Sequence, residues 1–328
     1  MNILIIDSES RAYIDTLTHE QNHVGESINL TYVSGMSQIK NEHLEQADAV
    51  IVYFGNDLHS HHIKKLSKCK GIVAATAGFN NIDIQTAKNQ GIPVCNIPDY
   101  GYEDVADHTI ALMLGCIRKL PTAQYQIRNN CWNWHTVKGS MRLKGKKFGV
   151  IGLGRIGHAV ATRAQAFGMD ISFYDPYLEQ SQHPEFLKID HLKEFLSVTD
   201  VISINCPLTE ETKHLINKDT LSFLHPHSII INTARGAIIE QSALTQALRT
   251  NQIGGVGLDV LETEPLIPQE LLSMDNVILT PHSAFYTQES LALMRTLAIT
   301  SAINFLNGDL SLNSIVNDIH EVHYAHTA

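Results

Sequence analysis

Hydrophobic residues occur along the chain in short β-branched runs that alternate with longer amphipathic stretches. In the first third, this pattern predicts strands at residues 2–6, 30–33, 49–53, 71–74 and 93–96, and helices at 11–20, 61–68 and 84–89. A second series of apolar runs predicts strands at 147–151, 170–174, 201–204, 228–231, 256–260 and 276–279. Because strands and helices alternate throughout, we expect an α/β protein whose parallel sheets are covered by helices on both faces.

The domain organisation is suggested by two predicted helices, residues 103–118 and 288–306. Both are apolar around most of their circumference, which is typical of burial between layers or domains, and they bracket the second series of strands. We therefore predict two Rossmann-like or flavodoxin-like, doubly wound domains, one inserted into the other. Residues 1–100 and 286–328 would form the substrate domain, and residues 101–285 the inserted dinucleotide-binding domain. The tail after residue 317 has no pattern and is expected to be loosely held.

Composition excludes several classes of protein. The 328 residues are 44% hydrophobic and 18% charged, as in ordinary globular proteins. A formal net charge of −10 without a basic block argues against nucleic acid or a membrane surface as the main partner, and no apolar run is long enough to span a bilayer. Five cysteines without a CxxC pair argue against a disulfide framework, and Met1 is followed by a strand pattern instead of a signal peptide. We expect a cytoplasmic protein.

A dinucleotide-binding motif lies at residues 152–157, which read GLGRIG between a predicted strand and a predicted helix at 158–167. Gly152 would permit the tight turn, Gly154 the approach of backbone to a pyrophosphate, and Gly157 the packing of helix on strand. The helix N-terminus would then face the anion. Arg155 and Ile156 lie between these glycines and are predicted with them to contact the cofactor.

The choice of cofactor follows from Asp175, which ends the next predicted strand 18 positions after Gly157. A carboxylate at this place hydrogen-bonds the ribose hydroxyls of the adenosine and repels a 2′-phosphate. Pro176 and Tyr177 follow, with no arginine to receive such a phosphate. The sequence therefore predicts NAD(H) instead of NADP(H).

Three further polar side chains follow successive predicted strands: Arg235, Glu264 and His282. Ligands of doubly wound sheets bind beyond the carboxyl ends of the strands, so we expect these groups to meet at the cofactor crevice. A guanidinium can bind a substrate carboxylate through two hydrogen bonds. An imidazolium can protonate a carbonyl oxygen, and a carboxylate can orient the imidazole and favour its charged form. This chemistry suits the reduction of a 2-oxo acid.

These motifs together resemble the D-isomer-specific 2-hydroxyacid dehydrogenase family over nearly the whole chain. The matching stretches are AGFNNID at 77–83, GLGRIG at 152–157, CPLT at 206–209 with Thr212, NTARG at 232–236, LDVLETEP at 258–265 and TPHSA at 280–284. The resemblance implies catalytic roles for Arg235, Glu264 and His282. It also implies that the backbone of the 77–79 loop binds the substrate carboxylate, and that further residues contact the cofactor. The substrate-binding residues would be Ala77, Gly78 and Phe79, and the further cofactor-binding residues Cys206, Pro207, Thr212, Thr233, Ala234 and Asp259.

Residues 98–108 and 281–286 look most like the branch that contains the C-terminal-binding-protein-like dehydrogenases. Two positions depart from it: Ala74 stands where many members have arginine, and Phe285 where the corepressor members have tryptophan. Substrate identity therefore does not carry over. The resemblance implies a homodimer that acts on a small 2-oxo or 2-hydroxy acid, and Trp132 and Trp134 are expected at a subunit contact. The resemblance leaves open an NAD(H)-sensing, corepressor-like dimeric binding protein. Formate dehydrogenase is disfavoured, because that enzyme has glutamine where this chain has Glu264.

Two histidine-rich segments resemble metal sites. Residues 19–23 spell HExxH, and His59, His61 and His62 lie within four positions. Because HExxH has no third ligand at a useful spacing, and the second cluster reads as a solvated loop and helix start, the sequence predicts no metal site.

Overall fold

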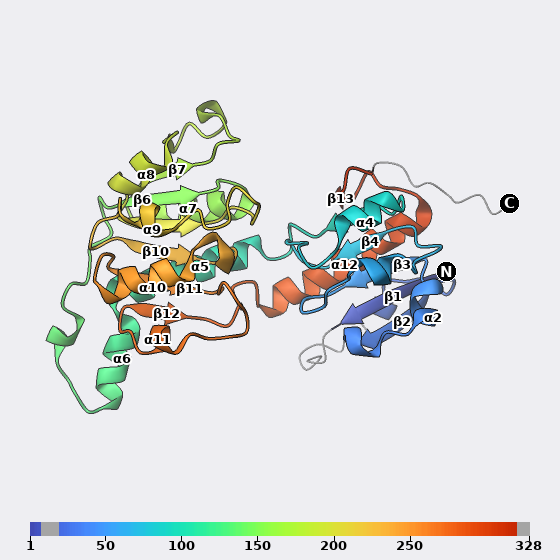
Figure 1. Cartoon of the computed structure of the whole chain (residues 1–328), viewed down its shortest axis with the longest axis horizontal. Coiled ribbons are helices and arrows are strands. Elements are labelled where there is room, and N and C mark those ends of the chain that lie inside the picture. The colour runs from blue at the N-terminus through green and yellow to red at the C-terminus, as the bar shows by residue number, and fades with distance from the viewer. Residues whose placement is uncertain (8–19, 320–328) are drawn as a thin grey trace. The chain divides into compact units, whose positions relative to one another are not determined.

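The computed structural model describes residues 1–7 and 20–319. The helix expected at residues 11–20 lies outside this range apart from Glu20, and most of the tail expected to be loose lies outside it as well. The chain divides into two compact units, Met1–Gly101 with Thr287–Ala328, and Tyr102–Tyr286 (Figure 1). Each unit is built on one sheet of its own.

The first unit has a six-stranded sheet in the order β13-β5-β4-β3-β1-β2. Its strands are β1 Asn2–Asp7, β2 Asn29–Ser34, β3 Ala49–Val52, β4 Ile72–Ala74, β5 Val94–Asn96 and β13 Ser314–Ile315, and its helices are α2 Asn41–Glu45, α3 Ser60–Ile63, α4 Ile84–Asn89 and α12 Gln288–Asn307. All pairs are parallel except that of β13 with β5. The order 2-1-3-4-5 of the parallel strands is that of flavodoxin-like sheets.

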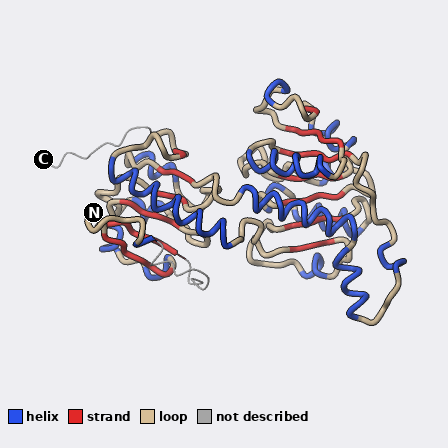
Figure 2. Tube along the Cα trace, turned by 180° about the vertical axis from the view of Figure 1, so that it is seen from behind, coloured by secondary structure: helices blue, strands red, loops and turns tan. Residues whose placement is uncertain are grey.

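Helix α12 packs on the sheet of the first unit, although in the sequence it follows the whole second unit. It contacts β3 and β4, and Figure 2 shows it lying across the strands of this sheet. Near its C-terminal end, the Phe305 ring fills the space that a Cβ at Gly71 would need, since that atom would lie 2.2 Å from the ring. The core on the other face of the sheet includes Ile63 of α3 and Ala87 of α4.

A buried polar network also joins α12 to this sheet. The Arg295 guanidinium donates to Asp7 Oδ2 at 2.8 Å and to Glu20 Oε1 at 3.0 Å. The hydroxyls of Tyr53 and Tyr32 donate to the same glutamate. Asp7, Glu20 and Arg295 are at most 7% exposed, so the guanidinium supplies charge that two buried carboxylates need.

The second unit has a seven-stranded, all-parallel sheet in the order β12-β11-β10-β9-β6-β7-β8. Its strands are β6 Lys147–Ile151, β7 Asp170–Tyr174, β8 Leu187–Lys188, β9 Val201–Ile204, β10 Ile229–Asn232, β11 Gly255–Leu258 and β12 Val277–Leu279. Its helices are α5 Tyr102–Arg118, α6 Leu120–Arg128, α7 Arg155–Ala166, α8 Leu192–Val198, α9 Lys218–Leu221, α10 Gln241–Arg249 and α11 Gln269–Leu272. Counted from β6, the order is the 3-2-1-4-5-6 of dinucleotide-binding sheets with one strand added.

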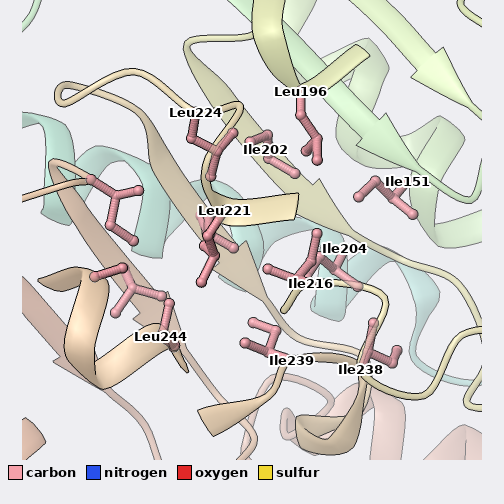
Figure 3. Packing of buried hydrophobic residues seen from close by; sticks show 14 of the residues in the cluster. Ile151, Leu196, Ile202, Ile204, Ile216, Leu221, Leu224, Ile238, Ile239 and Leu244 are labelled. Carbon is pink, nitrogen blue, oxygen red and sulfur yellow. The ribbon is translucent and has the colours of Figure 1, made fainter. Parts of the chain in front are cut away.

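The second unit has two hydrophobic cores, each between the sheet and one layer of helices. One layer contains α8, α9 and α10, whose residues Leu196, Leu221 and Leu244 lie in one cluster with Ile202 and Ile204 of β9 (Figure 3). Ile230 of β10 belongs to the same cluster. The other contains α5 and α7, which pack against Ile229 and Ile231. Successive residues of β10 thus face opposite layers, which explains why its first three residues are all isoleucine.

The predicted fold class is confirmed, and the boundaries of the predicted strands agree within two residues, whereas the short strands β8 and β13 were not predicted. The helix expected from residue 158 begins at Arg155, because Gly154 is its N-cap. The helix expected at residues 61–68 is α3, which ends as a helix at Ile63. Among the described residues, no helix has both the length and the apolar character needed to cross a bilayer.

Candidate active site

The glycine-rich turn follows β6, and each glycine has a separate geometric reason. Gly152 has a φ of +84°, and a Cβ there would lie 2.8 Å from Cys206 backbone atoms. A Cβ at Gly157 would lie 2.1 Å from the Gly152 carbonyl oxygen, so only glycine lets α7 approach the turn. At Gly154, in contrast, a Cβ would meet nothing within 4 Å. This space lies at the N-terminus of α7, which Arg155 and Ile156 open, and suits an anionic group.

Asp175 lies directly after β7 and is fixed against this turn. Its Oδ2 accepts a hydrogen bond from the Leu153 N–H at 3.0 Å, and its Oδ1 accepts one from the Tyr177 N–H at 3.0 Å. The carboxylate is therefore held beside the glycine turn, where the ribose of a dinucleotide lies when its pyrophosphate occupies the helix N-terminus.

The loop after β9 contains Cys206, Pro207 and Thr212. The Thr212 hydroxyl donates to the Pro207 carbonyl at 2.6 Å and accepts from the Thr209 N–H at 2.7 Å, which fixes the shape of the loop. Burial raises the pKa of the Cys206 thiol to about 11, so the group is neutral near pH 7. A thiol of this kind packs against the turn and is a poor nucleophile.

The loop after β10 is shaped by Asn232. Its side-chain oxygen accepts from the Ala234 N–H at 3.0 Å, and its amide nitrogen donates to the Arg235 carbonyl at 2.9 Å. The buried Thr233 hydroxyl lies 2.8 Å from that of Thr109 on α5. The Arg235 guanidinium donates to the Ala234 carbonyl at 2.6 Å. These contacts fix the backbone from which the arginine projects.

The loop after β12 is fastened by Asp259, which is 2% exposed. Its two carboxylate oxygens accept from the Thr280 hydroxyl at 2.6 Å and from the N–H groups of Ser283 and Ala284 at 2.9 Å each. His282 lies between these anchors with a φ of +53°, a left-handed conformation that the surrounding bonds enforce. The main contact of the Asp259 carboxylate is thus with this loop, and its predicted contact with the cofactor stays a prediction.

Glu264 and His282 form a hydrogen-bonded pair. Glu264 Oε2 lies 2.8 Å from His282 Nδ1, and Glu264 Oε1 accepts from the Leu261 N–H at 3.0 Å. Burial raises the pKa of Glu264, but the hydrogen bond and charge of His282 and the charge of Arg235 outweigh burial and lower that pKa overall. Glu264 is therefore an anion at neutral pH, and the imidazole directs Nδ1 toward it.

The structure thus brings Arg235, Glu264 and His282 to one end of the second unit's sheet. Part of the reason is Gly236, where a Cβ would lie 1.9 Å from the Leu261 carbonyl, so the loops after β10 and β11 touch. The predicted substrate loop, Ala77, Gly78 and Phe79, follows β4 in the first unit. There, Asn96 donates to the Ala77 carbonyl at 2.6 Å and Thr76 to the Gly78 carbonyl at 2.5 Å.

Several supporting residues were not found from the sequence. His108 of α5 lies 3.0 Å from the Thr280 hydroxyl and 3.6 Å from Asp259, and the adjacent Thr109 supports Thr233. A signal was present, because His108 and Thr109 form a polar pair within a largely apolar helix. For Asn232, the sequence shows only that it opens the NTARG motif at 232–236, and nothing there indicates that its side chain holds the loop.

Comparison with known proteins gives the family. Residues 110–284 match the family model described as "D-isomer specific 2-hydroxyacid dehydrogenase, NAD binding domain". A glyoxylate reductase of Thermococcus litoralis is 35% identical over 85% of this chain and 86% of its own length. A D-3-phosphoglycerate dehydrogenase of Methanocaldococcus jannaschii is 37% identical over 84% of this chain, which spans only 52% of that protein.

The fold comparison agrees with the sequence comparison. The crystal structure of a D-lactate dehydrogenase from Aquifex aeolicus, complexed with NAD and lactic acid, superimposes with a TM-score of 0.85 at 29% identity. The match covers 96% of this chain and 99% of that one. The glycine turn, its open space at Gly154 and the fixed Asp175 carboxylate fit the NAD of the family. The chain belongs to the D-isomer-specific 2-hydroxyacid dehydrogenase family and is an NAD-dependent oxidoreductase of that family.

Proposed function

We propose that the protein interconverts a small 2-oxo acid and the corresponding D-2-hydroxy acid, with Arg235, His282 and Glu264 as its catalytic residues. The observation that carries this proposal is the 2.8 Å contact between Glu264 and His282, beside a guanidinium whose charge acts on the same carboxylate. A proton donor, its orienting anion and a carboxylate-binding cation then lie at the end of one dinucleotide-binding sheet.

Arg235 binds the substrate in this proposal. Its guanidinium presents a planar set of donors, which matches the two oxygens of a carboxylate and can also reach a neighbouring carbonyl. The backbone of Arg235 is fixed by Asn232, so the side chain starts from one defined position. We also assign the loop Ala77, Gly78 and Phe79 to substrate binding, and thereby the first unit to the substrate and the second to the cofactor.

His282 is the general acid and base in this proposal. NADH supplies a hydride to the substrate carbon when it is bound. His282 Nδ1 is engaged by Glu264, so Nε2 is the nitrogen that gives a proton to the carbonyl oxygen in reduction and takes it back in oxidation. Glu264 remains charged throughout, because its role is to orient the ring and favour the imidazolium.

We further propose that NAD(H) is preferred over NADP(H), because the fixed Asp175 carboxylate would repel a 2′-phosphate. A cytoplasmic homodimer is proposed as well. All five cysteines are free thiols, which suits a reducing compartment. Trp132 and Trp134 are 92% and 78% exposed in the single chain, which suits packing anchors at a subunit contact.

The test is a steady-state panel of 2-oxo acids with NADH, graded from glyoxylate and pyruvate to branched and aromatic side chains. We expect turnover with at least one of these acids, and its loss in His282→Gln while NADH binding is retained. If the protein binds NADH but turns over no acid in the panel, the catalytic proposal is wrong and an NAD(H)-sensing binding protein becomes the better description.

A further inference from the structure

A cluster of three metal-ligating side chains lies apart from the candidate active site. His158 belongs to the second turn of α7, and His183 and Glu185 belong to the connection between β7 and β8. One ligand atom from each of these side chains lies within 4.8 Å of the other two. Glu185 Oε1 is 3.3 Å from His158 Nε2 and 3.4 Å from His183 Nδ1.

We propose that His158, His183 and Glu185 bind a divalent transition-metal ion, with zinc as the best match. Two imidazoles and a carboxylate are the donors that zinc takes in three-ligand sites, where the fourth position holds water. Ligands about 2.0–2.1 Å from a tetrahedral ion lie roughly 3.3–3.4 Å from one another. The two distances from Glu185 therefore already equal the edge of such a tetrahedron.

The connection that supplies two of the ligands is internally ordered. The Gln180 side chain donates to the carbonyls of His183 and Phe186, at 3.1 and 2.8 Å, and accepts from the Lys188 N–H at 2.7 Å. The His183 ring packs nearly perpendicular to the ring of Phe173 of β7, with ring centroids 6.4 Å apart. The three ligating side chains remain 24–44% exposed, so an ion from solution can reach them.

Binding would have a structural consequence for the cofactor site. Helix α7 begins at the glycine turn, and the connection from β7 begins with Asp175, so an ion held by both would fasten these two cofactor-facing segments to each other. Metal binding itself does not depend on the proposed reaction. Its effect on NADH affinity rests on the assignment of Asp175 to the adenosine ribose.

A second histidine group of the chain provides the matched control. The rings of His59, His61 and His62 have centroids 3.8–6.1 Å apart, so this group could also attract metal ions nonspecifically. It lies in the first unit at the start of α3. Replacement of His61 therefore removes an imidazole from a histidine-rich surface without touching the proposed ligands.

The experiment is a titration of the metal-depleted full-length protein with Zn²⁺ alone, by calorimetry, for the wild type, His183→Gln, Glu185→Gln and His61→Gln. Co²⁺ absorption then reports the coordination geometry. We expect one zinc equivalent whose affinity falls at least about tenfold in His183→Gln and Glu185→Gln and is unchanged in His61→Gln. The Co²⁺ complex of the wild type should have a four-coordinate spectrum.

Equal zinc affinity in the wild type and His183→Gln would overturn the site, as would loss of binding in His61→Gln alone. Because a misfolded variant would also lose metal, the thermal midpoint of each metal-free variant is measured first and should match that of the metal-free wild type. Zinc binding with no change in NADH affinity would refute the link to Asp175 and leave the metal site standing. The failure of the reaction proposal is seen separately, in the 2-oxo-acid panel.

Discussion

The exchange of Glu264 for glutamine tests the catalytic pair most directly. Glutamine keeps the shape of the side chain and can still accept from the Leu261 N–H through its oxygen. Its amide nitrogen would then face His282 Nδ1, the contact that Glu264 Oε2 makes at 2.8 Å. Because an imidazolium has donors at both nitrogens, it cannot bond to this amide, and only the neutral ring can accept from it. The variant should therefore disfavour the form of His282 that donates the proton in reduction.

The size of this effect follows from the geometry of the pair. A hydrogen bond between charged groups contributes about 1.5–3 kcal/mol, and one between neutral groups about 0.5–1.5 kcal/mol. The side chains of His282 and Glu264 are 23% and 36% exposed, so solvent screening weakens their interaction. The free energy lost in the variant should therefore lie near the lower end of the difference between these two ranges. We expect a loss of about 1 kcal/mol, which corresponds to a factor of about five in an equilibrium constant.

The sign is fixed by the proton that reduction consumes. Reduction requires a proton on His282, and the Glu264 carboxylate accepts the hydrogen bond that the protonated ring donates from Nδ1. Without the carboxylate, the falling limb of reductive kcat/KM should move to lower pH, and oxidation should reach its plateau at lower pH. Both profiles are measured by steady-state kinetics with NADH and NAD, and Glu262→Gln, two residues away, is the matched control. Superimposable profiles for wild type and Glu264→Gln would refute the role of Glu264.

Three further predictions concern carboxylate binding by Arg235, the preference for NADH, and the glycine-rich turn after β6. Arg235→Lys should raise the KM for the oxo acid and lower kcat while NADH affinity is kept, since an ammonium cannot form the planar pair of hydrogen bonds. A near-normal kcat/KM would show that another residue binds the substrate carboxylate. Wild-type kcat/KM should favour NADH over NADPH at least about tenfold, and Asp175→Ala should narrow this ratio; equal values in the wild type would rule out the repulsion. Gly157→Ala should lower the thermal midpoint because its Cβ would lie 2.1 Å from the Gly152 oxygen, whereas Gly154→Ala should keep the midpoint and weaken NADH binding. Equal midpoints for these two variants would contradict the packing argument.

The strands were predictable because both faces of each sheet are covered. The fully buried run Ile229–Asn232 has no polar alternation, and the motif residues Arg235 and His282 follow such strands by a fixed few positions. Helix α6 was not predicted, and the structure leaves none of its residues buried. Strand β13 was also missed, since two residues that pair antiparallel at a sheet edge leave no periodic signal.

The supporting contacts of the candidate site were not predictable from spacing. Thr109 and Thr233 are 124 positions apart, and their contact exists only because α5 packs on β10. The contact of His158 with Glu185, outside this site, likewise joins residues 27 positions apart, one on α7 and one in the connection between β7 and β8. Sequence motifs record the residues that follow a strand, whereas the partners that hold them come from whichever helix covers that strand.

The position of α12 in the chain has a consequence for synthesis on the ribosome. Translation of the second unit, Tyr102–Tyr286, takes on the order of 10–40 s at about 5–20 residues per second. During this time the sheet β1–β5 lacks the helix that covers β3 and β4, and Asp7 and Glu20 lack the guanidinium of Arg295. The contiguous second unit can therefore fold first, while the N-terminal segment has apolar strands without their covering helix and two carboxylates without their arginine. This interval is when the nascent chain is most exposed to aggregation and to chaperones.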